Sequence, residues 1–509
     1  MEFMTNLKEL QNGSDIRGVA LDTDPAMPVN LSEKEVYALS RAFGTWLRHR
    51  LKKNDLTVAV GRDSRTSGKK LAHAAEDALV YDGADVLDTG LSSTPAMFMS
   101  TVFDEINADG AIMLTASHMP ENRNGMKFFY KGGGLDAEDV AEIIHIAEKK
   151  DFIHLHGGSL TGFDLMKIYA EHLRNIIAEK IDSDSERPLE GLHIVVDAGN
   201  GAGGFFATQV LEPLGANIEG SQFLDPDGTF PNHIPNPENK EAMESLIEAV
   251  KKNHADLGLI FDTDVDRSSA VDENGNPIGS NDLIALASLL ASRAHPHMTV
   301  VTDSVTSDEL KDFLDQKGIR QHRFKRGYRN VINEAKRLNE EGEDAALAIE
   351  TSGHAAFKDN YFLDDGAYLA AQIVVEAASQ SISDLLSELA HPALEEDFRF
   401  PVTEKAFRAY GEQVIEDLKN YARESDTIEL VEPNYEGARI RFTTPYGKGW
   451  ALVRISLHES LLPVHIESDQ PKAAAYMAEE LFDFLAQYPS LDLKDLKSYI
   501  RSNRVPEDE

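Results

Sequence analysis

Residues 56–63 read Leu-Thr-Val-Ala-Val-Gly-Arg-Asp, a short β-branched run that ends in a polar turn and leads into a helical pattern from Lys69. The same order recurs twice along the chain, with expected strands at 193–196 and 298–302 and expected helices at 205–214 and 308–316. Short apolar strands that end at a loop before an amphipathic helix are typical of βα units in a mostly parallel sheet. The repetition predicts three α/β domains of similar type.

The C-terminal part of the chain has a different pattern. Expected strands follow in close succession at 438–443, 450–457 and 463–467, before an amphipathic helix at 471–487. This order predicts a small antiparallel α+β domain. The expected fold class is therefore α/β, with three similar mixed-sheet α/β domains plus a smaller C-terminal α+β domain. The expected domain bounds are 1–160, 161–290, 291–392 and 393–509.

Composition excludes several classes of function. The chain has 509 residues, with 50 Lys and Arg against 87 Asp and Glu, so its formal net charge is −37. Such a charge argues against a general binder of nucleic acid or of anionic membranes. The absence of cysteine excludes disulfides, thiolate metal sites and thiol nucleophiles. No signal peptide and no run of about 20 apolar residues is found. We expect a cytoplasmic enzyme or a binder of small molecules.

The most specific local motif is Asp262-Thr-Asp264-Val-Asp266-Arg267, which follows the apolar run 257–260. In an extended or looped backbone, residues i, i+2 and i+4 project to one side, so the three carboxylates can converge on one hard cation. An EF-hand is excluded because Arg267 occupies the position of its turn glycine and strands flank the loop. A polar loop that faces water remains the alternative.

A second motif places Ser117 beside His118, after an expected strand at 111–114, with Lys127 a few residues on. In α/β proteins, functional sites lie at the carboxyl ends of strands. Ser117 could be a nucleophile or a phosphoryl carrier. A capping serine is the commoner explanation, and this segment alone favours it.

Three further segments each have a functional and a structural interpretation. The cluster Gly199–Gly204 matches a dinucleotide-binding fingerprint, but a tight strand-to-helix turn explains it equally well. The stretch Glu350–His354 suits a polyhydroxylated ligand or is an ordinary polar turn. Arg454 and Ser456 could bind a phosphate together, or alternate along a solvent-facing strand.

The order of these loops, one per expected domain, resembles the α-D-phosphohexomutase superfamily, which moves phosphate between C1 and C6 of hexoses. The resemblance covers almost the whole chain. It also includes the segments Asp15–Gly18, Gly61–Arg65, Thr94–Pro95, Asp197–Gly201, Asp227–Asn232 and Asp365–Gly366. It implies that the four domains surround a central cleft and that the Gly199–Gly204 cluster is part of the architecture.

The resemblance also implies a role for each motif. Ser117 would be the phosphoserine, and Mg²⁺ would be held by its phosphate with Asp262, Asp264 and Asp266. The implied catalytic residues are Ser117, Arg17, His118, Lys127, Arg267 and His354. The implied substrate-binding residues are Lys325, Gly327, Glu350, Ser352, Arg454 and Ser456. A hexose 1,6-bisphosphate would be intermediate and activator, the partner would be a small phosphosugar, and the protein would be a monomer or a homodimer.

Several positions depart from the family pattern. Met119 replaces the usual Asn, and Thr351 stands where Met, Gln or Glu is usual; Leu457, His458 and Ser460 alter the phosphate loop. We therefore expect a phosphohexomutase for glucose or mannose phosphates, with its sugar preference open. The alternatives are a phosphoglucosamine mutase, a non-catalytic sugar-phosphate-binding paralogue and, more distantly, an NAD-linked oxidoreductase.

Overall fold

A computed structural model describes residues 6–181, 185–456 and 459–503. These residues form two compact units. The first contains the described residues up to Ala294 together with Ser352–Ser387, and the second contains His295–Thr351 and the described residues from Glu388 onward. Among the helices of the described ranges, none has the length and apolar character that crossing a membrane requires.

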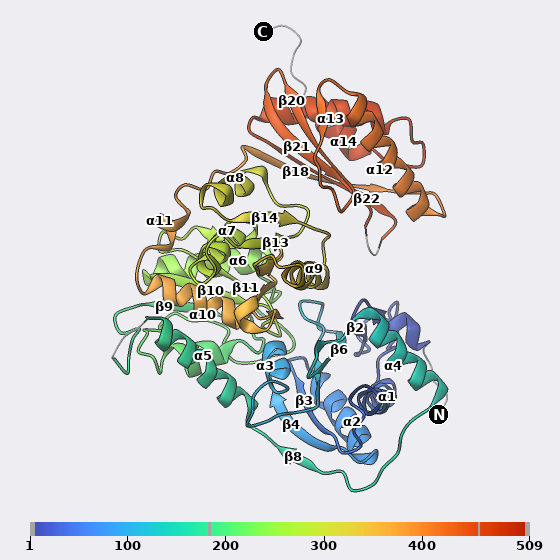
Figure 1. Cartoon of the computed structure of the whole chain (residues 1–509), viewed down its shortest axis with the longest axis vertical. Helices are drawn as coiled ribbons and strands as arrows, with labels where there is room; N and C mark the ends of the chain where they lie inside the picture. Colours follow the sequence, from blue (N-terminus) through green and yellow to red (C-terminus); the bar gives the residue numbers. More distant parts are fainter. Residues whose placement is uncertain (1–5, 182–184, 457–458, 504–509) are drawn as a thin grey trace. The chain divides into compact units, whose positions relative to one another are not determined.

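The first sheet of the first unit has eight strands in the order β1-β2-β6-β5-β3-β4-β8, with β7 on β6. Figure 1 labels β2, β6, β3, β4 and β8 of this sheet. It is mixed, because β3 pairs in parallel with β4 and β5, whereas β6 is antiparallel to β2 and β5. The strands are β1 (Gln11–Asn12), β2 (Asp15–Val19), β3 (Thr57–Arg62), β4 (Asp85–Leu91), β5 (Gly110–Leu114), β6 (Arg123–Tyr130), β7 (Gly133–Gly134) and β8 (Leu160–Gly162).

Helices cover this sheet. They are η1 (Leu7–Leu10), α1 (Glu33–Leu51), α2 (Gly68–Tyr81), α3 (Thr94–Met99) and α4 (Ala137–Lys149). A capping box formed by Ser32 and Glu35 starts α1, which satisfies two backbone N–H groups at the helix N-terminus. Phe43 and Trp46 of α1 are buried in one core with Phe128 of β6. This core supports β3, β5 and β6, whose ends carry site residues.

The second sheet of the first unit has the order β12-β11-β10-β9. Its strands are β9 (Ile194–Asp197), β10 (Leu257–Phe261), β11 (Ser268–Val271) and β12 (Pro277–Ile278). The remaining elements of the unit are α5 (Leu165–Ile181), η2 (Phe206–Leu211), α6 (Lys240–Asn253), α7 (Ser280–Ser292), β16 (Ala355–Phe357), η3 (Lys358–Asn360), β17 (Leu363–Asp364), α10 (Gly366–Ala377) and α11 (Ile382–Leu386). The helix expected at 205–214 is shorter than predicted and is a π-helix over Phe206–Leu211.

The glycine cluster after β9 serves packing. A Cβ on Gly201 would lie 2.7 Å from the carbonyl oxygen of Thr263, and one on Gly204 would lie 2.2 Å from that of Leu224. Neither position can hold a larger residue without moving backbone. The close approach to Thr263 brings this turn against the acidic loop of residues 262–267.

The second unit contains three parallel strands in the order β14-β13-β15, namely β13 (Thr299–Thr302), β14 (Arg320–Arg323) and β15 (Ala345–Ile349). Helix α8 (Asp308–Gln316), as predicted, follows β13, and α9 (Tyr328–Glu340) follows β14. The carboxyl ends of the three strands lie at one edge of the sheet, where loops 303–307, 324–327 and 350–351 begin.

The C-terminal part of this unit is an antiparallel sheet in the order β18-β22-β21-β20-β19. Its strands are β18 (Leu394–Pro401), β19 (Ile428–Leu430), β20 (Ala438–Thr444), β21 (Gly447–Val453) and β22 (Leu461–Ser468). Figure 1 shows α12 (Phe407–Glu424), α13 (Pro471–Leu485) and α14 (Lys494–Asn503) alongside this sheet. The strand expected at 450–457 begins earlier and ends at Val453, and Leu457 lies outside the described residues.

A histidine in this sheet makes the stability of the C-terminal part depend on pH. The Nδ1 of His465 lies 2.9 Å from Asp397 Oδ1, and its Nε2 lies 3.0 Å from Glu467 Oε1. Burial alone would lower the pKa of His465, but the two carboxylates raise it to about 9. Folding therefore gains from the imidazolium, and this gain is complete below the unfolded pKa of about 6.5 and disappears as pH rises through about 9.

Substituting His465→Gln is therefore expected to destabilise the protein at pH 6 by about 1–2 kcal/mol and hardly at all above pH 9. This loss of stability is smaller than the pKa shift alone would give, because solvent screens the charge of Asp397, which is largely exposed. Urea unfolding of both forms across this pH range measures the difference. A difference that stays constant or grows with pH would contradict the assignment.

Candidate active site

Ser117 lies on a turn after β5. Its φ of 50° is left-handed, which is uncommon for a residue other than glycine, and its side chain is buried with 7% of the residue exposed. The backbone N–H of Ser117 donates to Thr115 Oγ1 over 2.9 Å, and its Oγ donates to Asp262 Oδ2 over 2.9 Å. The turn thus aims the hydroxyl at the acidic loop, and a strained backbone is often found where function demands such an orientation.

Arg65 holds this turn in place. Its guanidinium donates to the carbonyl oxygens of Ser117, Met119, Pro120 and Arg123, over 2.5 to 3.0 Å. Only 1% of Arg65 is exposed, and Asp63 Oδ2 balances its charge at 3.2 Å from Nε. The motif Gly61–Arg65 therefore has a structural reason: its last residue shapes the turn that presents Ser117.

The three aspartates of the acidic loop converge as the spacing predicts. The loop joins the antiparallel strands β10 and β11, and one carboxylate oxygen from each of Asp262, Asp264 and Asp266 lies within 4.8 Å of the others. All three residues are buried. Burial, together with Asp266 and Asp264, raises the pKa of Asp262 well above its ordinary value. The alternative of a polar loop that faces water is therefore wrong.

These residues fit a divalent cation. Within the described part of the chain, the Oδ1 atoms of Asp264 and Asp266 are buried and have no hydrogen-bond partner. Buried acceptors without a partner cost free energy, which a bound cation would offset. Oxygen donors are those that Mg²⁺ and Ca²⁺ prefer. Asp262, Asp264, Asp266 and the Oγ of Ser117, which is adjacent to Asp262, would form the ligand set.

Arg267 connects the acidic loop with the serine turn. Its Nε lies 3.4 Å from Asp262 Oδ2, and its Nη2 donates to Ser117 Oγ over 3.4 Å and to His118 Nδ1. The residue is 1% exposed. A fully buried guanidinium at the serine oxygen can stabilise negative charge on a group carried there.

His118 is uncharged at neutral pH. Burial and the charge of Arg267 lower its pKa to about 3. As a neutral ring whose Nδ1 accepts from Arg267, His118 orients that guanidinium rather than supplying a proton.

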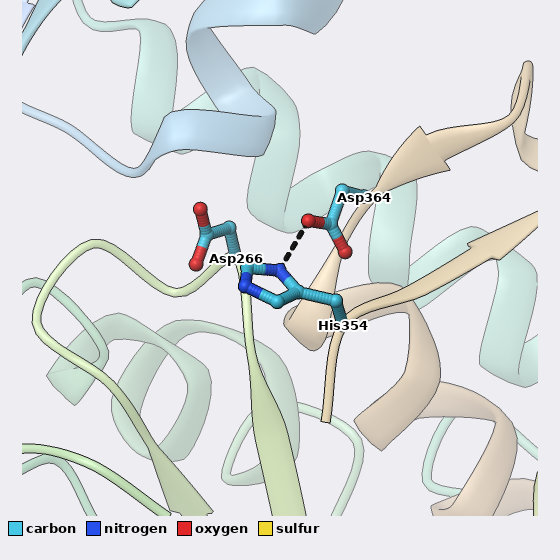
Figure 2. Close-up of side chains that lie close together, drawn as sticks. All are labelled: Asp266, His354 and Asp364. Atoms are coloured by element: carbon cyan, nitrogen blue, oxygen red, sulfur yellow. Dashed lines mark hydrogen bonds and ion pairs between the residues drawn. The ribbon is translucent and has the colours of Figure 1, made fainter. Parts of the chain in front are cut away.

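His354 lies between two carboxylates (Figure 2). Its backbone bridges to that of Arg267, and the hairpin of β16 and β17 brings Asp364 next to the ring. Nδ1 of His354 is hydrogen bonded to Asp364 Oδ2. Burial alone would lower the pKa of His354, but Asp364 and Asp266 raise it to about 9. His354 therefore carries a proton at neutral pH and can donate it.

Two further cations complete the group in the first unit. Lys127 on β6 donates to Asp266 and lies 3.7 Å from Asp264 Oδ2. With Arg267 and His354 it holds the pKa of Asp266 below its ordinary value, although burial alone would raise it. Arg17 on β2 donates to the carbonyl of Thr115 and pairs with Asp15 over 2.9 Å.

The other predicted residues belong mainly to the second unit. Glu350 Oε1 accepts from the backbone N–H of Gly327 over 2.6 Å, and Lys325 lies in the same loop as Gly327. Ser456 Oγ accepts from the N–H of Glu459, and burial, followed by the charge of Arg326, lowers the pKa of Arg454. Ser352 belongs to the first unit. Leu457 and His458 lie outside the described residues, so their departures from the family pattern stay without a structural account.

The sequence interpretation missed some contacts of the site. Asp364 had no assigned role, although it directly precedes the Asp365-Gly366 pair. Arg65 has no assigned role beyond its place in the segment Gly61–Arg65. Thr94 belongs to the segment Thr94–Pro95, and its Oγ1 donates to Asp264 Oδ2 over 2.5 Å. Thr94 is the first residue of α3, and its place in a Thr-Pro pair at a helix start was the available signal. Arg65 contacts backbone oxygens, which leave no signature in residue types.

The comparisons with known proteins agree with this geometry. Three family models match: phosphoglucomutase/phosphomannomutase alpha/beta/alpha domain I at residues 8–154, domain II at 167–275 and domain III at 279–393. A phosphomannomutase/phosphoglucomutase of Pseudomonas aeruginosa (strain PAO1) is 33% identical over 461 residues, 89% of this chain and 90% of the relative. A phosphoglucomutase of Neisseria gonorrhoeae is 30% identical and covers 92% and 94%.

A solved structure is also similar. The crystal structure of a phosphoglucomutase/phosphomannomutase family protein from Burkholderia thailandensis has a TM-score of 0.78 at 27% identity, covering 95% of this chain and 99% of that one. With the matched domains and these relatives, the chain belongs to the phosphoglucomutase/phosphomannomutase family.

Proposed function

We propose that the chain interconverts hexose 1-phosphate and hexose 6-phosphate, with glucose or mannose as the sugar, through a phosphoserine at Ser117. One observation carries the proposal: the Oγ of Ser117 lies 2.9 Å from Oδ2 of the buried Asp262 and 3.4 Å from Nη2 of Arg267. A lone hydroxyl in that position is surrounded by the charges that phosphoryl transfer requires.

In each transfer, the bond between phosphorus and Ser117 Oγ breaks and a bond to the free hydroxyl of the sugar forms. The sugar hydroxyl loses a proton, and the serine oxygen takes one up or remains charged beside Arg267. The resulting hexose 1,6-bisphosphate then returns its other phosphate to Ser117 by the same exchange in reverse. No phosphate is gained or lost over the cycle.

The side chains divide the work by charge. Arg267 and Arg17 would stabilise the transferring group, with His118 orienting Arg267. Lys127 and His354 are the proton carriers, and His354 enters as an acid because its pKa is about 9. A Mg²⁺ ion at Asp262, Asp264 and Asp266 would supply charge neutralisation for the phosphate.

The sugar would be held by residues of the second unit and by Ser352 of the first. Glu350 and Ser352 would bind hydroxyls, Lys325 and Gly327 would line the sugar from the loop before α9, and Arg454 and Ser456 would bind the phosphate that is not reacting. The carboxylate of Glu350 is already oriented by the N–H of Gly327. Pre-orientation of this kind lowers the entropic cost of binding.

The test is an assay with glucose, mannose, glucosamine and N-acetylglucosamine 1-phosphates, each with Mg²⁺ and a hexose 1,6-bisphosphate. We expect conversion of glucose or mannose 1-phosphate into the 6-phosphate, and its loss when the divalent cation is chelated. Preferred turnover of the amino sugars would favour a phosphoglucosamine mutase instead. Saturable binding without turnover of any sugar, by protein whose metal has been restored, would favour a non-catalytic binder.

A further inference from the structure

Asp303 is a buried carboxylate directly after β13, with 0% exposed, and it takes no part in the proposed phosphoryl transfer. Its Oδ2 accepts from Thr351 Oγ1 over 2.7 Å and lies 3.5 Å from the Nε of Arg326. Its Oδ1 has no hydrogen-bond partner among the described residues. A buried carboxylate with one oxygen left without a hydrogen bond is costly for stability, and its position indicates another reason for its presence.

That position is between two loops of the proposed sugar site. Because β13 is the central strand of β14-β13-β15, Asp303 lies between the loop after β14 and the turn after β15. Arg326 belongs to the first loop and Thr351 to the second. Glu350 and Gly327 join the same loops through a 2.6 Å hydrogen bond. Two polar connections, one from a buried carboxylate, therefore set the spacing between the loops.

The same network extends to the C-terminal sheet. Glu436, just before β20, accepts from the backbone N–H of Arg326 over 3.1 Å and from Ser304 Oγ. Tyr435 packs on Phe324, with ring centroids 5.0 Å apart. A Cβ on Gly437 would lie 2.9 Å from the Cβ of Arg454. Residues 435–437 therefore contact both the loop that contains Lys325 and the Cα–Cβ part of Arg454.

We propose that Asp303 is the positioning residue of the sugar site, and that its hydrogen bond to Thr351 determines how strictly the site distinguishes hexoses. This proposal rests on the proposed function. Asp303 does not touch the sugar. By holding Thr351 and Arg326 together, it keeps Glu350 and Lys325 at the separation that a hexose requires, and a change of that separation alters which hydroxyl configuration is accepted. The substrates concerned are epimeric hexose 1-phosphates such as those of glucose and mannose.

The argument favours positioning over a purely structural role because Thr351 is adjacent to Glu350. The hydroxyl of Thr351 can be removed with little change in volume by valine, while serine keeps the hydroxyl. A structural contact would affect the unfolding transition alone. A positioning contact changes KM and the ratio of kcat/KM between epimers.

The experiment compares Thr351→Val, Thr351→Ser and Asp303→Asn with wild type, with glucose 1-phosphate and mannose 1-phosphate as substrates. For Thr351→Val we expect KM to rise about 10-fold with kcat within about threefold, and the ratio of kcat/KM between the two sugars to change at least threefold. Thr351→Ser should restore values near wild type. Asp303→Asn should also raise KM, because it removes the charge that pairs with Arg326.

Thr299→Val is the matched control, since Thr299 is a buried threonine of β13 whose Oγ1 accepts from Arg320 Nε over 3.1 Å. It should leave KM and the sugar ratio unchanged. The proposal would be overturned if Thr351→Val kept the wild-type KM and the wild-type ratio of kcat/KM between the two sugars. It would also be overturned if Thr299→Val raised KM as much as Thr351→Val does. If Thr351→Val fails to fold, Asp303→Asn gives the same decision. Absence of turnover in the wild-type protein would contradict the proposed function. Unchanged KM and sugar ratio in active variants would contradict only the positioning role of Asp303.

Discussion

Replacing Ser117 with alanine is expected to lower turnover of hexose 1-phosphate by about 10⁴-fold or more, the scale of effect seen when a catalytic nucleophile is removed. The hydroxyl is the only atom group lost, and it is the one that points at Asp262 and Arg267. Without it, no phosphoryl group can be carried between the two ends of the sugar. The measurement is the initial rate with saturating bisphosphate activator.

Mass spectrometry adds a second readout for the same variant. Wild-type protein incubated with a hexose 1,6-bisphosphate should gain the mass of one phosphoryl group on the peptide that contains Ser117, and the variant should not. Ser100→Ala is the control, because Ser100 is a buried serine of the same domain whose Oγ donates to the carbonyl of Met97. Undiminished turnover in Ser117→Ala would rule out a mechanism through a phosphoserine at this position.

Arg65→Lys is expected to lower kcat by about 100-fold and the free energy of unfolding by about 2–4 kcal/mol. Lysine keeps the positive charge beside Asp63 but cannot span the carbonyls of Ser117, Met119, Pro120 and Arg123 with a planar fork. Buried carbonyl oxygens would lose their donors, and the turn that aims Ser117 would relax. Small misplacements of a reacting group have effects of this size.

Rates are compared at a temperature where both forms are folded, and stability is measured by urea unfolding. Arg41→Lys is the matched control: Arg41 binds Asp82 through two hydrogen bonds of 2.7 and 2.8 Å in the same domain, and its loss should reduce stability without changing kcat. If Arg65→Lys proved as active as wild type at equal folded fraction, Arg65 would have no part in orienting the serine turn.

Features that depend on neighbours along the chain were predictable. The Asp262–Arg267 loop converges because its spacing is local, and α8 has the predicted bounds because its amphipathic pattern is local. The strand predicted at 450–457 was misplaced, because the start and end of a β-strand depend on its partners. β21 pairs with β20 from Gly447 to Val453, so it begins and ends with that partner.

Contacts between distant segments were not predictable from residue types alone. Ser117 and Asp262 are 145 positions apart, and only the packing of two sheets brings them together. Asp303 and Thr351 are 48 positions apart and meet across two neighbouring strands. Even Asp364, only 10 positions from His354, reaches it only when β16 pairs with β17. Each of these contacts depends on which strands and sheets pack together, and the residue types of a short segment do not specify that.

The sequence by itself determined which chemical groups are available: a serine, three aspartates in one loop, and basic residues in or beside the motifs of a chain of net charge −37. The tertiary structure decided their state. His118 and His354 are the same residue type, yet burial beside Arg267 lowers the pKa of His118 to about 3, and two carboxylates raise that of His354 to about 9 despite its burial. Protonation follows the local dielectric and the nearest charges, and both are set only when distant segments pack.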